Sequence, residues 1–203
     1  DRRHHGYVSV RYGVVHSLNT IAAQVMDRLT PAASYDFLTQ KLHMELEPDD
    51  RNYAPLSMGQ LSIGTTAREM ASAYTIFQTG GTYVQGRTFS EIRDHNGNVI
   101  CENKPVTEQA INGKTANWMT DILQEAVRSG TGTGARLNNM PSAGKTGTTS
   151  DNKDRWFVGY TPYYVGAVWT GYETPAKISV SGNPAAALWK KVMTSLHEDR
   201  PYK

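Results

Sequence analysis

Apolar residues recur at helical spacing along the front of the chain. Three segments show this spacing, and their apolar positions are Ile21, Val25 and Leu29, then Tyr35, Leu38 and Leu42, then Met70, Ala73, Tyr74 and Phe77. Thr20 is the expected N-cap of the first segment, and Thr30-Pro31 starts the second, since proline is tolerated at the first helical position. Thr66 opens a capping box before the third, and Gly80-Gly81 ends it. The pattern predicts a mainly helical lobe over residues 1–81.

The pattern then changes to strands, with helices between them. Two short runs flank Asn96-Gly97, a dipeptide typical of β-hairpin turns, and a helix follows that ends at Gly130. Three strand-like runs come next, at residues 144–149, 155–160 and 164–171. Their short polar turns favour antiparallel pairing, because parallel neighbours need long crossovers. A last helix opens at Asn183-Pro184. We therefore expect an antiparallel sheet with backing helices over residues 82–203, and an α/β chain of the α+β kind.

Composition narrows the class of protein. The 203 residues are 38% hydrophobic and 20% charged, which is ordinary for a globular domain. The net charge of +2 comes without a basic block, so nothing points to nucleic acid as a partner. Cys101 is the single cysteine and cannot form an internal disulfide. The six histidines lack metal-ligand spacing, so we expect neither a metal nor a cofactor.

A lysine motif stands at the start of the first of the three strand-like runs. Residues 144–149 read Gly-Lys-Thr-Gly-Thr-Thr, and residues 155–162 read Arg-Trp-Phe-Val-Gly-Tyr-Thr-Pro. A lone Lys-Thr-Gly is common, but here the next strand begins with this particular aromatic run. The combination resembles the third active-site motif of penicillin-binding proteins.

A second motif lies near the start of the chain. Ser17-Leu18-Asn19 is similar to the Ser-x-Asn motif of the same family and precedes Lys145 by 128 residues. The stretches at residues 61–74 and 128–135 also resemble the family, and the agreement in order and spacing covers residues 8–198. The resemblance is to the transpeptidase domain of bifunctional, class A penicillin-binding proteins. It implies their fold, an antiparallel sheet flanked by helices plus a helical lobe, as in serine β-lactamases.

The family's nucleophile lies in a Ser-x-x-Lys motif upstream of Ser-x-Asn, and the 16 residues before Ser17 do not contain one. Literal matches occur at residues 142–145 and 150–153. The first overlaps a strand, where positions i and i+3 face opposite ways, and the second falls in a polar turn. We expect the nucleophile to lie on another segment of the same protein. Residues 1–203 would then be the C-terminal part of one transpeptidase domain, with an incomplete core and no activity alone.

The resemblance assigns roles to Ser17 and Asn19. The Ser17 hydroxyl would relay a proton toward the leaving amine, and Asn19 would orient the substrate amide and the catalytic lysine of the other segment. Both are expected on a short loop between helices. From spacing alone, both residues can equally be helix caps, since serine and asparagine favour that position.

The lysine motif would bind the substrate. Lys145 would make the electrostatic potential more favourable for an anionic substrate and assist proton movement near Ser17. Thr146 and Thr148 share one strand face, so their hydroxyls can hold the terminal carboxylate of a D-alanyl-D-alanine peptide or of a β-lactam. Gly147 allows close approach of the substrate, and the resemblance makes the Thr148 N–H an oxyanion donor. Without the other motifs, the same residues fit a plain edge strand with a solvated lysine.

Three expectations concern residues outside the motifs. Residues 130–134, Gly-Thr-Gly-Thr-Gly, lack the lysine of a phosphate loop and are expected to form a flexible connection near the cleft. Acidic residues at 47–50 are expected to face solvent. The aromatic residues expected in the core are Trp156, Phe157, Tyr160 and Trp169.

The implied activity is that of an acyl-serine DD-transpeptidase, which cross-links peptidoglycan stem peptides and is acylated by β-lactams. Its partners would be D-alanyl-D-alanine stem peptides, β-lactams and the Ser-x-x-Lys segment. Its place would be outside the cytoplasm, anchored to the cell membrane through an N-terminal region. Two alternatives stay open, a β-lactamase-type hydrolase and a β-lactam-sensing receptor domain. Thr149 and the aromatic continuation resemble the synthases more than the lactamases.

Overall fold

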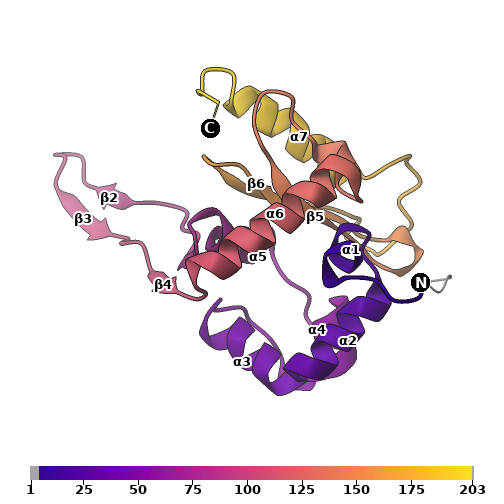
Figure 1. The fold of residues 1–203 in the computed structure, drawn as a ribbon. Coiled ribbons are helices and arrows are strands. Elements are labelled where there is room, and N and C mark those ends of the chain that lie inside the picture. The colour runs from indigo at the N-terminus through magenta and orange to yellow at the C-terminus, as the bar shows by residue number, and fades with distance from the viewer. Residues whose placement is uncertain (1–4, 203) are drawn as a thin grey trace.

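The computed structural model describes residues 5–202. Helices form the front of the chain, and most of them gather in one lobe at the bottom of Figure 1. Within this lobe α2 contacts both α3 and α4. The helices of this part are α1 (Val10–Val15), α2 (Asn19–Leu29), α3 (Pro31–Gln40), α4 (Tyr53–Met58) and α5 (Ala67–Gln78).

Local capping explains where these helices begin. The Thr66 hydroxyl accepts from the Glu69 N–H, and the Glu69 carboxylate accepts from the Thr66 N–H, which confirms the predicted capping box of α5. Thr30 caps α3, as predicted. The expected cap at Thr20 is wrong, because α2 already begins at Asn19. The chain turns directly from α1 into α2, and the Leu18 carbonyl accepts the first helical hydrogen bonds.

The three predicted runs form one antiparallel sheet in the order β5-β6-β7. Helix α6 (Gly113–Ser129) ends at Gly130 as predicted, and α7 (Pro184–Leu196) begins after Asn183. The strands are β5 (Ala143–Thr148), β6 (Arg155–Tyr160) and β7 (Val165–Thr170). Strand β5 is an edge strand, so it can pair with something else along its free side.

Helices cover both faces of this sheet. On one face the fully buried Phe157 packs edge-on against Trp189 of α7, with ring centroids 5.0 Å apart. On the other face Tyr160 stacks on Phe77 of α5, and its hydroxyl is hydrogen-bonded to Thr120 of α6. Residues 157 and 160 face opposite ways because strand side chains alternate. The sheet therefore lies between α7 and the pair α5 and α6.

A hairpin arm projects away from this body (Figure 1). Strands β1 (Thr82–Val84) and β4 (Thr107–Gln109) pair at its base, and β2 (Glu91–Arg93) and β3 (Val99–Glu102) pair at its tip. Gly97 takes a φ of 86° in the turn, which confirms the hairpin predicted from Asn96-Gly97. No helix within residues 5–202 has the length and apolar character needed to cross a membrane.

Two expectations about burial are wrong. Trp169 is 44% exposed, and its indole N–H donates to the Asp154 carboxylate instead of lying in the core. Asp50 was expected to face solvent but is fully buried. Its carboxylate accepts from the backbone N–H groups of Glu47 and Ser62 and from the Ser62 hydroxyl, so the buried charge has three hydrogen-bond partners.

Candidate active site

Ser17 lies in the tight connection between α1 and α2. Its φ of 56° is in the left-handed region, which is uncommon for a residue other than glycine. The Ser17 N–H donates to the Val14 carbonyl at 3.2 Å, and the Leu18 N–H donates to the Gly13 carbonyl at 2.8 Å. These two bonds fix the turn and present the serine hydroxyl. Asn19 is exposed in the first turn of α2, so the expectation that it lies on the loop is wrong by one residue.

Lys145 joins the two sequence motifs in space. Its ammonium group donates to the Ser17 hydroxyl at 2.8 Å and to the Thr146 carbonyl at 3.1 Å. Burial of the side chain lowers the pKa of Lys145 to about 8. The lysine can therefore gain or lose a proton close to neutral pH, while it touches a hydroxyl that the resemblance gives a proton-transfer role.

The remaining residues of the lysine motif line the free edge of the sheet. Thr146 and Thr148 share a face, as the alternation predicts, and Gly147 lies opposite Trp156 on β6. Thr148 is exposed, and Thr146 is partly buried. A side chain at position 147 would bring its Cβ within 3.1 Å of the Trp156 Cβ. The edge therefore offers two hydroxyls and the open side of strand β5 to an extended partner.

Thr131 also belongs to this site, although no sequence motif assigns a role to it. Its hydroxyl oxygen lies 2.9 Å from that of Thr146. The Thr131 N–H donates to the Val15 carbonyl, and the Gly132 N–H donates to the Ala126 carbonyl. The glycine-rich run thus lies beside the site as expected, but these bonds hold its backbone in place. The sequence signal for Thr131 is its place in the stretch at residues 128–135, which resembles the family but assigns no role to this threonine.

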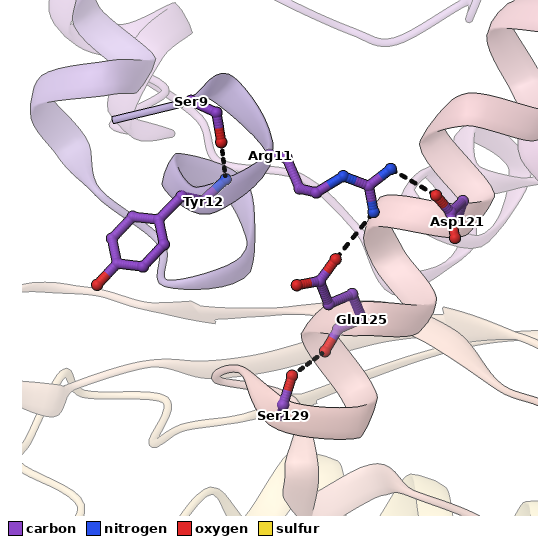
Figure 2. A network of polar contacts seen from close by, with 6 residues as sticks. All are labelled: Ser9, Arg11, Tyr12, Asp121, Glu125 and Ser129. Carbon is purple, nitrogen blue, oxygen red and sulfur yellow. Dashed lines mark hydrogen bonds and ion pairs between the residues drawn. The ribbon is translucent and has the colours of Figure 1, made fainter. Parts of the chain in front are cut away.

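A network of charges attaches α1 to α6 (Figure 2). Arg11 donates through one guanidinium nitrogen to Asp121 and through the other to Glu125, the latter at 2.8 Å. At the same end of α1, Ser9 caps the helix by accepting from the Tyr12 N–H. One guanidinium shared by two carboxylates fixes direction as well as distance. The network therefore places α1, and with it the turn at Ser17, against the helix that leads to Thr131.

The Ser-x-x-Lys look-alikes do not have the geometry of a helical nucleophile motif. Ser142 is buried just before β5, and the lysine three positions later is a strand residue. Ser150 begins a three-residue 3-10 turn, η3 (Ser150–Asn152), in which Asp151 has a φ of 60°. Neither serine shares a helical face with a lysine. Among residues 5–202, the structure shows no cluster of histidine, cysteine and acidic side chains that could hold a metal ion.

The sequence of this chain is similar to those of known proteins. The family of the penicillin-binding protein transpeptidase domain matches residues 1–194. The chain belongs to this family. Penicillin-binding protein 1A of Clostridium botulinum (strain Langeland) is 37% identical over 203 residues, which are 98% of this chain and 24% of the relative. Penicillin-binding protein 1A of Clostridium acetobutylicum is 38% identical over 197 residues, 95% of this chain and 24% of the relative. The chain thus spans about a quarter of the length of these curated relatives.

Solved structures of penicillin-binding proteins share the fold. The penicillin-binding protein PonA1 of Mycobacterium tuberculosis superposes with a TM-score of 0.85 at 25% identity, over 99% of this chain and 59% of that chain. Penicillin-binding protein 1A of Haemophilus influenzae gives a TM-score of 0.81 at 20% identity, over 99% of this chain and 36% of that chain. The predicted fold class and the kinship with class A penicillin-binding proteins are confirmed.

Proposed function

We propose that residues 1–203 form the C-terminal part of the transpeptidase domain of a DD-transpeptidase, and that another segment of the same protein supplies the nucleophilic serine. In this division residues 1–81 are mainly helical and carry Ser17, with α5 reaching over to cover the sheet, and residues 82–203 provide the sheet with Lys145. The observation that carries the proposal is the 2.8 Å hydrogen bond between Lys145 Nζ and Ser17 Oγ. It brings together the Ser-x-Asn and Lys-Thr-Gly motifs, in a chain of the penicillin-binding family.

The contact between Lys145 and Ser17 suits proton transfer. The nucleophilic serine gives its proton to the catalytic lysine of its own segment and attacks the carbonyl of the penultimate D-alanine. The peptide C–N bond then breaks, and the departing amine of the terminal D-alanine needs a proton. Because Lys145 donates to Ser17 Oγ, the serine's own proton is free to point toward that amine. Ser17 then gives its proton to the leaving group and takes one from Lys145, whose pKa of about 8 suits both steps. In the second half-reaction the amine of another stem peptide attacks the acyl-serine along the reverse proton path.

Substrate binding is assigned to the edge of β5. The stem peptide lies along this edge as an added strand, and Gly147 lets its backbone approach closely. The hydroxyls of Thr146 and Thr148 bind the terminal carboxylate, near the positive charge of Lys145. The Thr148 N–H is one donor to the oxyanion of the tetrahedral intermediate. Asn19, at the start of α2, orients the substrate amide and the catalytic lysine of the other segment.

The proposed partners are stem peptides that end in D-alanyl-D-alanine and the β-lactams that mimic them. The proposed location is outside the cytoplasm, with a membrane anchor in the part of the protein before this chain. The relatives are named penicillin-binding proteins, so a β-lactamase or a sensing receptor is not favoured.

The test of this function is an assay on the whole protein that contains this chain. We expect release of D-alanine and formation of cross-linked peptide from polymerised peptidoglycan substrate, both blocked by penicillin through a long-lived adduct. Rapid hydrolysis of penicillin without cross-linking would identify a lactamase instead. A stable adduct with no turnover of any stem peptide would identify a sensor.

Valine replacements test the carboxylate assignment. Thr146→Val and Thr148→Val keep the β-branched shape and remove only the hydroxyl. A hydrogen bond to a charged group contributes about 1.5–3 kcal/mol, so each variant should lose roughly ten- to a hundredfold in acylation efficiency. The loss should largely disappear with a substrate whose terminal carboxylate is amidated. Equal losses with the acidic and the amidated substrate would show that the two threonines only pack.

A further inference from the structure

The segment of Gly130 and Thr131, at the end of α6, contacts both halves of the site. The Thr131 N–H donates to the carbonyl of Val15, two residues before Ser17, at 3.2 Å. The Thr131 hydroxyl oxygen lies 2.9 Å from that of Thr146, the residue after Lys145. The same residue is therefore bonded to the helical lobe through its backbone and to the substrate edge through its side chain.

The position of this segment is closely determined. A Cβ on Gly130 would lie 2.3 Å from the Val15 carbonyl oxygen and 3.0 Å from the Ala126 Cα, so only glycine lets the end of α6 meet the end of α1. The ion pairs of Arg11 with Asp121 and Glu125 also join α1 to α6 (Figure 2). Thr131 thus has little freedom to move relative to the turn at Ser17.

The hydroxyl pair has a chemical consequence for carboxylate binding. Each threonine hydroxyl has one proton to donate and can accept as well, whereas an ionised carboxylate only accepts. When Thr146 donates to a carboxylate, its proton is no longer available to Thr131. Thr131 can then donate its own proton to the Thr146 oxygen, so the contact between the two hydroxyls is kept with its direction reversed. Two hydrogen bonds in series polarise each other, which strengthens the one to the carboxylate.

We propose that Thr131 is a positioning residue for substrate recognition. Its hydroxyl holds the Thr146 hydroxyl in the orientation that binds the terminal carboxylate, and its backbone ties that orientation to the turn at Ser17. This inference rests on the proposed transpeptidase function. The inference adds Thr131 to the site. The preference for a substrate with a terminal carboxylate then depends on this residue.

The variants Thr131→Val and Thr131→Ser separate the hydroxyl from the shape of the side chain. In the whole protein, Thr131→Val should lower the acylation efficiency for a D-alanyl-D-alanine substrate about three- to tenfold, which is the usual effect of one neutral hydrogen bond. The loss should lie in KM, with kcat nearly unchanged. Thr131→Ser should behave like the unmodified protein. The control is Thr133→Val, an exposed threonine in the same run, which should change neither parameter.

The decisive experiment is a double-mutant cycle with Thr146→Val. If Thr131 acts through Thr146, then Thr131→Val has no further effect once the Thr146 hydroxyl is gone, and it has none on an amidated substrate. The inference is overturned if Thr131→Val is harmless alone, if its loss is equal in both backgrounds, or if Thr131→Ser is as damaging as valine. Any of these three outcomes overturns the inference about Thr131 alone, and the proposed function stands as long as penicillin acylates the unmodified protein. A protein that neither releases D-alanine nor binds penicillin overturns the function itself.

Discussion

Replacing Lys145 with methionine is expected to slow acylation of the whole protein about 10²–10³-fold, the usual cost of one preorganised charge or donor at a reacting centre. The side chain keeps its length, but the bond to Ser17 and the positive charge beside the β5 edge are lost. The measurement is the second-order rate of acylation by a fluorescent penicillin. Lys145→Arg keeps the charge and serves as the matched control, with a smaller loss.

The pH profile gives an independent check on the same residue. Because the pKa of Lys145 is about 8, the acylation efficiency should fall as the pH rises through 8 and the ammonium charge is lost. The arginine variant stays charged and should lack this fall.

The free energy of unfolding should change with pH in the opposite sense to the acylation efficiency. The folded-state pKa lies below the unfolded value of 10.5, so the unfolded chain binds more protons between pH 8 and 10.5, and stability should rise with pH in that window. Lys145→Met should remove this rise. Unchanged acylation together with a large drop in melting temperature would make Lys145 a structural residue.

Ser17→Ala is expected to reduce turnover of the stem peptide about 10²–10⁴-fold, the range found when a general acid is removed. Ser17→Gly should do the same without a loss of stability, because glycine adopts the φ of 56° freely. Steady-state release of D-alanine and the melting temperature are the two measurements.

Ser9→Ala is the matched control for Ser17. It removes the cap of α1, the helix that leads into the Ser17 turn, and should cost about 1 kcal/mol of stability without slowing turnover. If Ser17→Gly keeps full turnover, or if Ser9→Ala slows turnover as much as Ser17→Ala, then Ser17 matters only for the shape of the turn.

The sequence predicts the fold correctly where an element depends on residues that are close together in the chain. The capping box at Thr66, the hairpin at Asn96-Gly97 and the three antiparallel runs each depend on residues close in sequence, and the structure has all of them. The predicted cap of α2, Thr20, lies two residues after the observed cap, Leu18, because the chain runs straight on from α1 and the carbonyl of Leu18 accepts the first helical hydrogen bonds in place of a side-chain cap.

Features that depend on distant parts of the chain were missed. The sequence around Asp50 is typical of a solvated loop. In the structure its buried carboxylate accepts two hydrogen bonds from Ser62, 12 residues away. The aromatic character of Trp169 predicts a core position, but its indole N–H binds the carboxylate of Asp154, just before the neighbouring strand β6. Thr131 lies in a stretch that resembles the family, but its role could not be read from the sequence because it comes from contacts with Val15 and Thr146. The contact of Lys145 with Ser17 was foreseen only through the family resemblance.

The most direct test of the account is to locate the penicillin adduct in the whole protein by peptide mass spectrometry. The proposal predicts an adduct on a serine outside residues 1–203, three positions before a lysine, and none on the serines of this chain. An adduct on Ser142, Ser150 or Ser17 would contradict it, because the nucleophile would then lie within the chain itself.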